Sequence, residues 1–443
     1  MEQILIKNFK AIANKKAVPI EVKKMTVLMG EQASGKSTVA KLIYFFKTLR
    51  EEITFELIEN NNITPTNCDE IITNRIRRYF VFLFGSTRHL SNFEMTYTYQ
   101  NGIKANIKKN AKGNLHVEII DLQAVIRRAI KLKSELENHQ ASFNDLEQRE
   151  RNRIIKSIGK TIRDFFGSNQ NNLFLPASRN MTVMLEHHLT EIYARLENTV
   201  ALTLDLQGSN RFESENELIL LKFLQYVRFL KSKFQRAGNF QGLIDDELML
   251  NPKLDTTQAT ALIAKLNLVL KGNYQSDQYG EKIFFGQSGY VFLQNASSGQ
   301  QESIRTFQDI FLNLLYGDPV FRVIEEPESH LFASGQKRLI ESLAILLNQN
   351  SENQIIIPTH SPYILRVIDN LIKAYEVKNQ DTEHPVSTNE WIDFDTISAY
   401  NLINGEIFDA TNAEFRGIDA QLFDEVSNQI SNQFDELLTI QYP

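Results

Sequence analysis

Apolar residues alternate with polar ones near the start of the chain, at Ile4, Ile6 and Phe9 and again from Val18 to Val22. A period of two is typical of half-buried strands. The apolar-leaning run 25–29 has no such alternation, which indicates a strand buried on both faces. From residue 39 to residue 49 the apolar spacing becomes helical. The pattern therefore predicts short strands followed by a strand–turn–helix unit.

Strand-forming residues return between positions 78 and 120. Asn101-Gly102 and Lys112-Gly113-Asn114 are turn sequences that suit hairpins. We therefore expect a β-meander, with strands at 79–84, 93–99, 103–107 and 115–120.

A mostly helical segment separates the two halves of the chain. Residues 121–166 are charged, lack proline and carry apolar residues at irregular helical spacing, so we expect a short antiparallel helical pair. Residues 173–179 indicate a buried strand that ends in a loop. Residues 182–272 favour helix again, with interruptions at 208–216 and 238–242.

The last third of the chain alternates between strands and helices. Strands around 283–293 precede a helix over 302–315, and two apolar runs, 320–324 and 354–358, are separated by one helix. This alternation predicts an α/β fold, in which the two apolar runs are neighbouring parallel strands. The segments that we expect are residues 1–120, 121–282 and 283–443.

Charge is distributed unevenly along the 443 residues, whose net charge is −6. Residues 70–133 contain 12 basic and 4 acidic residues, whereas residues 381–443 contain 1 basic and 13 acidic residues. A basic stretch can bind nucleic acid, and an acidic tail usually repels it. The alternative is two solvated faces that partly neutralise each other.

Cys68 is the single cysteine, which excludes an intrachain disulfide and argues against thiol metal sites. The N-terminus lacks the apolar core of a signal peptide, and no run of eighteen apolar residues suggests a membrane span. We therefore expect a cytoplasmic protein without a membrane partner.

The turn after the first buried strand carries the pattern Gly-x-x-x-x-Gly-Lys-Ser of a phosphate-binding loop. Its backbone N–H groups, with the start of the following helix, would cradle the phosphates of ATP. Lys36 would reach the β- and γ-phosphates, and Ser37 would hold Mg²⁺. A chance match is disfavoured because the strand and the helix are both in place. The predicted nucleotide-binding residues are Gly30, Glu31, Gln32, Ala33, Ser34, Gly35, Lys36, Ser37 and Thr38.

The ends of the two later strands supply candidate catalytic groups. Glu325 follows the first strand, where a carboxylate can hold Mg²⁺ or its water shell. Glu326 is placed to polarise the water that attacks the γ-phosphate. His360 follows the second strand and could donate a hydrogen bond to that phosphate, although a histidine after a strand is more often structural. For the two carboxylates the alternative is an ordinary acidic turn.

A Ser/Gly turn precedes the helix over 302–315. Ser297, Ser298, Gly299 and Gln300 would place backbone N–H groups at a helix start, which suits anion binding. On its own the same sequence is also an ordinary helix cap.

Along the chain, the phosphate loop is followed by the Ser/Gly turn, the acidic strand end and then His360. This order of motifs resembles that of the ABC/SMC-type ATPase heads. Within that superfamily the chain is most similar to the OLD-like AAA ATPases of bacterial anti-phage systems, on the runs Glu325–Phe332 and Thr359–Leu365 and the opening Ile6–Phe9. The resemblance covers residues 1–50 and 285–370 best. It implies a P-loop ATPase head with a mixed sheet, a β-meander and a helical, short coiled-coil-like insertion.

The resemblance also implies an assembly. Two heads would pair head to tail as a homodimer or within a higher homo-oligomer, and Ser297 and Gly299 would contact ATP in trans. Asn8 and Lys10 would touch the nucleotide, and Arg179 would lie where the helical lobe meets the site. Glu325 stands where many heads have Asp, and Ala296 and Ser298 replace the usual Leu and Gly, so we expect slow hydrolysis.

OLD nucleases carry a TOPRIM nuclease domain after the head, but here residues 361–443 offer only the pair Asp393 and Asp395. The resemblance therefore implies no nuclease on this chain and a separate effector, TOPRIM-type rather than HNH-type, controlled by a phage trigger protein. Among such systems the ATPase subunit of PARIS fits better than that of Septu.

The leading hypothesis is an ATP-gated sensor and scaffold of anti-phage defence. The alternatives are an SMC- or RecF-like DNA-repair head that binds DNA in an ATP-dependent way, a transporter motor, and a nucleotide clamp that barely hydrolyses ATP. The basic stretch 70–133 supports the DNA-binding alternative.

Overall fold

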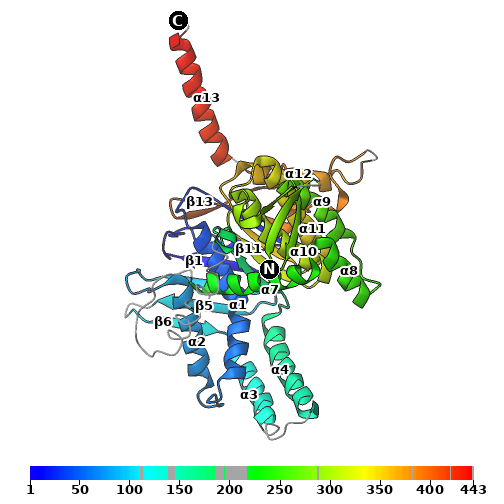
Figure 1. The fold of residues 1–443 in the computed structure, drawn as a ribbon. Coiled ribbons are helices and arrows are strands. Elements are labelled where there is room, and N and C mark those ends of the chain that lie inside the picture. Colours follow the sequence, from blue (N-terminus) through cyan, green and yellow to red (C-terminus); the bar gives the residue numbers. More distant parts are fainter. Residues whose placement is uncertain are drawn as a thin grey trace.

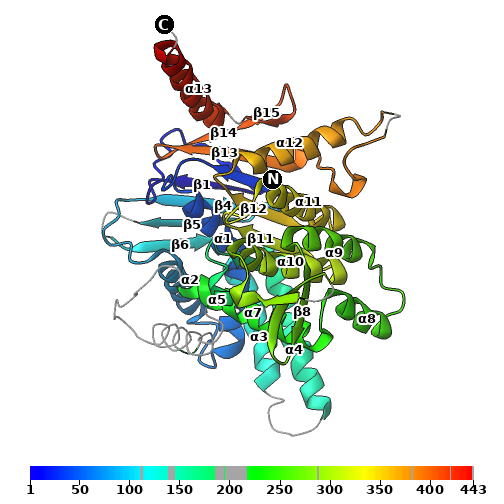
Figure 2. The ribbon, with the colours of Figure 1, turned by 45° about the horizontal axis from the view of Figure 1, so that its top comes forward.

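The computed structural model describes residues 1–109, 113–137, 145–184, 194, 217–286, 289–380, 383–419 and 421–441. Figures 1 and 2 show a body built on sheets and covered by helices, a helical pair on one side of it, and a C-terminal helix that points away from it.

A six-stranded mixed sheet forms the centre of the molecule, with the order β14-β13-β3-β12-β11-β7. All pairs are parallel except β13 with β14. This confirms the α/β class, the predicted neighbouring strands and the returning strand. The bounds are β3 (Met25–Met29), β7 (Asn171–Leu175), β11 (Val320–Ile324), β12 (Gln354–Pro358), β13 (Ile397–Ile403) and β14 (Glu406–Asp409).

A second, antiparallel sheet has the order β2-β1-β4-β5-β6 and contains the predicted β-meander. Its strands are β1 (Gln3–Lys7), β2 (Ile20–Glu21), β4 (Glu94–Thr98), β5 (Lys104–Lys109) and β6 (Leu115–Ile119).

The prediction of a strand at 79–84 is wrong, because these residues form the end of helix α2 (Cys68–Phe84). Ile72, Ile76, Tyr79 and Phe80 are buried at helical spacing, and the Phe45 ring on the neighbouring helix stacks on Tyr79. Packing therefore overrides the strand preference of the aromatic residues.

Helix α1 (Lys36–Glu59) lies between the two sheets. Its Phe46 ring stacks on Tyr97 of β4, with centroids 5.0 Å apart, and its Tyr44 ring meets Phe174 of β7 edge-on at 5.4 Å. Long apolar side chains on opposite faces of one helix therefore join both sheets into a common core.

The other face of the six-stranded sheet is covered by helices that share a second core with β3, β11 and β12. The helices are α9 (Thr257–Leu270), α10 (Ser298–Tyr316), α11 (Ala333–Gln349) and α12 (Pro362–Glu376). Covering both faces is what a parallel sheet requires.

The helical segment contains α3 (Leu122–Glu137) and α4 (Asp145–Phe166), which pack on each other as the predicted pair. It continues with α5 (Met181–Met184), α7 (Glu217–Ala237) and α8 (Phe240–Leu250). The interruption predicted at 238–242 separates α7 from α8, and the one at 208–216 lies outside the described residues. A small sheet follows, with β8 (Asn273–Asp277), which the sequence did not predict, β9 (Gly280–Phe285) and β10 (Gly289–Phe292).

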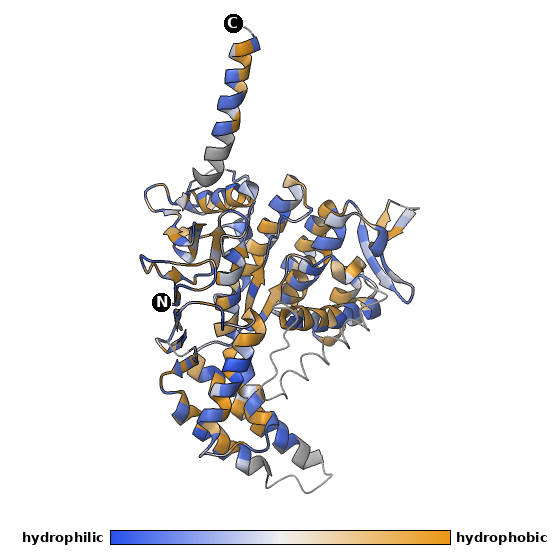
Figure 3. Cartoon of the chain, turned by 90° about the vertical axis from the view of Figure 1, so that its left-hand side faces the viewer, coloured by the Kyte–Doolittle hydropathy of each residue, from blue (hydrophilic) through white to orange (hydrophobic). Residues whose placement is uncertain are grey.

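The C-terminal segment ends in α13 (Gln421–Gln441), which carries exposed apolar residues such as Phe434 and Ile440 and projects from the body (Figure 3). No helix among the described residues is long and apolar enough to cross a membrane. The remaining short elements are Leu293–Asn295, Thr388–Glu390, Phe394–Thr396, β15 (Thr411–Asn412) and β16 (Gly417–Ile418).

Helix α10 is tied to the middle of β11 by a buried ion pair. Arg322 Nε lies 2.8 Å from Asp309 Oδ2, and the Tyr226 hydroxyl donates to Asp309 Oδ1 at 2.6 Å. Both charged side chains are 1% exposed. Neither charge can be solvated if its partner is lost.

We expect Asp309→Ala to lower the free energy of unfolding by about 3–5 kcal/mol, because Arg322 would remain buried and unpaired. Urea unfolding followed by circular dichroism measures this change. The control is Asp277→Ala, which removes a pair with Lys282 in which the aspartate side chain is 48% exposed and should change stability far less. Equal stability of Asp309→Ala and the wild type would contradict the prediction.

Candidate nucleotide site

The phosphate loop joins β3 to α1, as the sequence predicts. Gly30 has φ 141°, and a Cβ there would lie 2.4 Å from the Leu402 carbonyl oxygen. Gly35 has φ 105°, and a Cβ there would lie 3.0 Å from Ile12. Only glycine tolerates these conformations and close approaches. Glu31, Gln32, Ala33 and Ser37 are exposed at the surface of the loop.

The Lys36 ammonium is folded back onto its own loop. It donates to the carbonyl oxygens of Gly30 and Glu31, both at 2.8 Å, and lies 3.5 Å from Ser34 Oγ. Burial lowers the pKa of Lys36 to about 8, and the negative charges of Glu326 and Glu328 oppose that shift. The ammonium therefore lies where phosphate oxygens could replace the carbonyls as its partners.

The acidic strand end is fixed by its neighbours on both sides. The Glu325 N–H donates to Leu175 O at 3.0 Å, and the Glu326 N–H donates to Pro358 O at 2.9 Å. Glu325 is buried, and its Oε1 has no hydrogen-bond partner among the described residues. A buried carboxylate oxygen without a partner is a suitable ligand for Mg²⁺ or for its water shell.

The described residues contain no cluster of three or more His, Cys, Asp or Glu that could hold a metal ion. The ion would therefore take Glu325 and Ser37 from the protein and its other ligands from phosphate and water, which is usual for Mg²⁺.

The two candidate catalytic groups face each other. His360 Nε2 lies 3.8 Å from Glu326 Oε1, and the two side chains are 36% and 44% exposed. Glu328, to which the sequence assigned no role, holds this arrangement: its Oε1 accepts from Thr359 Oγ1 at 2.9 Å and from the His360 N–H at 2.6 Å. A carboxylate two residues after Glu326 was visible in the sequence, but its partner is 32 residues away.

The Ser/Gly turn lies in and just before the first turn of α10, which begins at Ser298 rather than at 302 as predicted. The Ser297 N–H and Oγ contact Gln300 Oε1 at 2.9 and 3.0 Å. Ser297 and Ser298 are exposed, and no hydrogen bond among the described residues joins this turn to the phosphate loop of the same chain. A Cβ on Gly299 would lie 2.5 Å from the His330 carbonyl oxygen, so this position needs glycine.

Arg179, which the resemblance assigned to the junction of the helical lobe with the site, contacts the acidic strand end. Its guanidinium donates to Glu325 O at 2.6 Å and to Glu326 O at 3.1 Å. Burial lowers the pKa of Arg179, and the Glu302 carboxylate on α10 opposes that shift.

The side chains of Asn8 and Lys10 contact residues at the end of α2 and just before β4. Asn8 Nδ2 donates to Asn92 O at 2.7 Å, and Lys10 Nζ lies 5.8 Å from the centre of the Phe84 ring. Their contact with nucleotide stays a prediction.

A cavity of about 360 Å³ beside the phosphate loop has a wall that the sequence did not indicate. The turn after β13 forms it, and Gly405 O accepts from the N–H groups of Ala13 and Asn14 at 2.8 and 2.9 Å. The cavity is lined by Ala11, residues 31–34 and residues 402–405.

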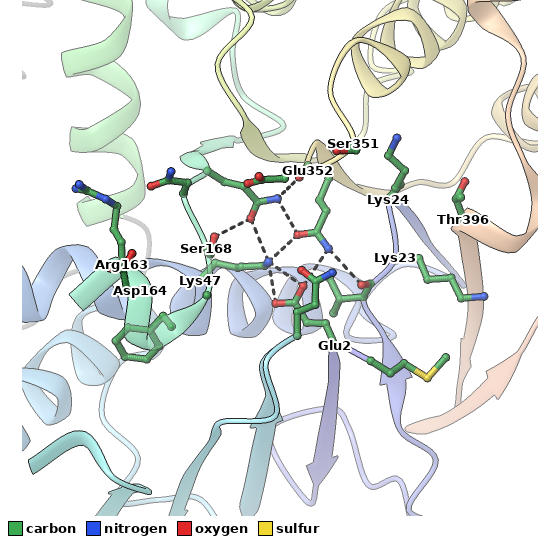
Figure 4. Close-up of a pocket in the computed structure, with 18 of the residues that line it drawn as sticks. Glu2, Lys23, Lys24, Lys47, Arg163, Asp164, Ser168, Ser351, Glu352 and Thr396 are labelled. Atoms are coloured by element: carbon green, nitrogen blue, oxygen red, sulfur yellow. Dashed lines mark hydrogen bonds and ion pairs between the residues drawn. The ribbon is translucent and has the colours of Figure 1, made fainter. Parts of the chain in front are cut away.

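Another cavity, of about 930 Å³, lies at the amino ends of the parallel strands, away from the phosphate loop (Figure 4). Lys47 of α1 contacts Glu2 at 2.8 Å, Gln170 at 3.1 Å and Gln354 at 2.6 Å there. These contacts use all three ammonium hydrogens, so Lys47 is a structural residue that joins α1 to β1 and β12.

The fold and the site define a phosphate-loop ATPase. Residues 1–365 match the family described as an AAA ATPase domain, and the chain belongs to this family. Among solved structures it is similar to an SMC head domain from Thermotoga maritima, with 10% identity, a TM-score of 0.35 and coverage of 92% of this chain and 97% of that one. No curated protein matches it.

We expect ATP affinity to fall as the pH rises through about 8. Phosphate binds the protonated ammonium, so the bound-state pKa of Lys36 is higher than the free value of about 8. Below this pH the group is protonated in both states. Above it, binding must take up a proton, which costs up to about tenfold in affinity per pH unit. Calorimetry in buffers of different ionisation enthalpy measures both the affinity and the proton uptake.

The control is Lys36→Arg, whose guanidinium stays protonated and should remove this pH dependence. A wild-type affinity that is constant from about pH 7 to pH 9 would contradict the assignment.

Proposed function

We propose that this ATPase works as a head-to-tail dimer and acts as an ATP-gated sensor and scaffold in cytoplasmic anti-phage defence. One feature of the structure supports the proposed dimer. Among the described residues, the phosphate loop, Glu325, Glu326 and His360 lie at one sheet edge, while Ser297 and Ser298 are exposed at the start of another helix. A second subunit would supply the missing turn to the γ-phosphate, through backbone N–H groups at that helix start.

In the proposed reaction Lys36 and the loop N–H groups hold the phosphates, and bound Mg²⁺ would supply positive charge against the developing negative charge. Glu326 accepts a hydrogen bond from the attacking water and aligns it with the γ-phosphorus. His360, held by Glu328 through its backbone N–H, donates a hydrogen bond to the γ-phosphate. Slow hydrolysis is part of this proposal.

The defence role rests on the runs Glu325–Phe332 and Thr359–Leu365, which resemble OLD-like ATPases. Asp393 and Asp395, the candidate nuclease pair, both lie near Arg416, at 3.7 and 3.2 Å, and are used within the fold. We therefore propose a separate effector, TOPRIM-type rather than HNH-type and PARIS-like rather than Septu-like, released when a phage trigger protein binds.

A second candidate function, ATP-dependent DNA binding, is favoured by one surface. Helices α3 and α4 expose basic residues along the helical pair, and the acidic C-terminal segment lies elsewhere in the molecule (Figure 1). The exposed residues are Arg127, Arg128, Lys131, Arg151, Lys156 and Lys160.

Glu326→Gln should lower kcat by about 100-fold while ATP still binds, because the water loses its acceptor. Lys36→Ala should abolish ATP binding. In light scattering after size exclusion, ATP should therefore produce a stable dimer of Glu326→Gln and none of Lys36→Ala. Both variants should lose protection against phage in cells.

The control is Asp395→Asn, which should hydrolyse ATP and protect like the wild type. Full protection by both Glu326→Gln and Lys36→Ala would exclude an ATP-gated defence role.

If the second candidate is correct, the protein binds duplex DNA more tightly with ATP, and the affinity falls steeply with salt. Lys156→Glu combined with Lys160→Glu should weaken this binding and reduce its salt dependence, as measured by fluorescence anisotropy. Absence of binding at low salt would rule out the DNA-binding function.

A further inference from the structure

The Arg179 guanidinium is buried where three parts of the site meet. Arg179 lies between β7 and α5, and its side chain is 1% exposed. It contacts the loop after β7 through Pro176 O at 3.0 Å, the acidic strand end, and helix α10. Among the described residues, its side chain contacts Pro176, Glu325, Glu326 and Glu302 and none of the phosphate loop, so its role is to hold other groups.

On one side the guanidinium holds the backbone that aims Glu326. It donates to the carbonyl oxygens of Glu325 and Glu326 at 2.6 and 3.1 Å. Glu326 has φ 42°, in the left-handed region that L-residues rarely adopt. Such a conformation is strained and persists only when its surroundings enforce it. Arg179 and the hydrogen bond from the Glu326 N–H to Pro358 O supply that enforcement.

On the other side the guanidinium holds the helix that begins with the Ser/Gly turn. Arg179 Nη2 lies 3.1 Å from Glu302 Oε1, and the Asn180 N–H donates to Glu302 Oε2 at 2.9 Å. Glu302 is one helical turn after Ser298, and its side chain is also 1% exposed. The same turn packs closely on the loop that follows Glu326, since a Cβ on Gly299 would lie 2.5 Å from the His330 carbonyl oxygen.

We propose that Arg179 and Glu302 form a strut that couples the exposed Ser297–Gly299 turn to the orientation of Glu326 in the same subunit. The strut rests on the proposed head-to-tail dimer. Docking of the turn on the partner's nucleotide sets the position of α10, and the strut passes that position to the carbonyls that fix Glu326. Each subunit thereby links the two ATP sites of the dimer. Arg179 and Glu302 are positioning residues.

Loss of an ion pair that is merely structural should lower stability without lowering kcat. The chain offers a matched control for this difference. Glu281 on β9 and Arg305 on α10 form another buried pair on the same helix, 2.7 Å apart, which does not reach the acidic strand end. Glu302→Gln and Glu281→Gln each remove one buried carboxylate charge next to an arginine, so both are expected to destabilise the fold.

The test compares the full-length wild type, Glu302→Gln, Arg179→Lys and Glu281→Gln, at a temperature where thermal melts show all four folded. ATP turnover gives kcat and the Hill coefficient, and a fluorescent ATP analogue gives the affinity. Glu302→Gln and Arg179→Lys should lower kcat about tenfold or more with unchanged affinity, because Glu326 loses its alignment. Their Hill coefficient should fall to one, and Glu281→Gln should keep both values of the wild type.

Two results would overturn the strut alone: wild-type kcat in Glu302→Gln, or equal losses of kcat in Glu302→Gln and Glu281→Gln. A wild-type protein without ATP turnover would overturn the proposed function and the strut together.

Discussion

The parallel pairing of β3 with β12 and β13 is the constraint on which the other features depend. Thr26 pairs with Ile356, and Val27 pairs with Ala399. Because the strands are parallel and in register, their carboxyl ends reach the same edge, and each is followed by a loop with site residues. This pairing also buries both strand faces, so helices must cover both sides of the sheet. Helix α1 is therefore both the start of the phosphate site and part of the core.

Negative charge is concentrated at the carboxyl edge of the parallel strands, and cationic side chains of the protein balance part of it. Three carboxylates, those of Glu325, Glu326 and Glu328, lie after one strand, and Lys36 and Arg179 are the cations placed near them. Glu328 Oε1 accepts hydrogen bonds from the His360 N–H and from Thr359 Oγ1, whereas, among the described residues, neither oxygen of Glu325 accepts a side-chain hydrogen bond that fixes the loop, and its buried Oε1 lacks a partner. The three carboxylates therefore have different roles. Glu328 holds the loop after β12, Glu325 is available for Mg²⁺, and Glu326 faces His360 and solvent.

Local patterns predicted the parts of the fold that local physics determines. The phosphate loop, the apolar strands, the β-meander and the helical pair each have a spacing or turn signal within a short window. The features that the sequence did not predict have a common cause, because they depend on contacts between residues that are far apart in the chain. Residues 79–84 are helical because of packing on Phe45 and Phe9, and the turn at 402–405 reaches the phosphate loop only through the sheet. The Arg179–Glu302 pair joins residues 123 positions apart, which no local spacing records.

Helix α10 connects the exposed Ser/Gly turn to the acidic strand end. Every residue from Gln301 to Leu315 is buried, whereas Ser297 and Ser298 are exposed. Such a helix cannot bend or slide alone, since its buried polar side chains would lose their partners. It is fixed to β9 through Arg305, to β11 through Asp309, and to the loop after β7 through Glu302. Two of these three attachments lead to β11 or to its carboxyl end. In the proposed coupling, a shift of the exposed turn would act on the acidic strand end through the contact of Glu302 with Arg179, which holds the Glu325 and Glu326 carbonyls.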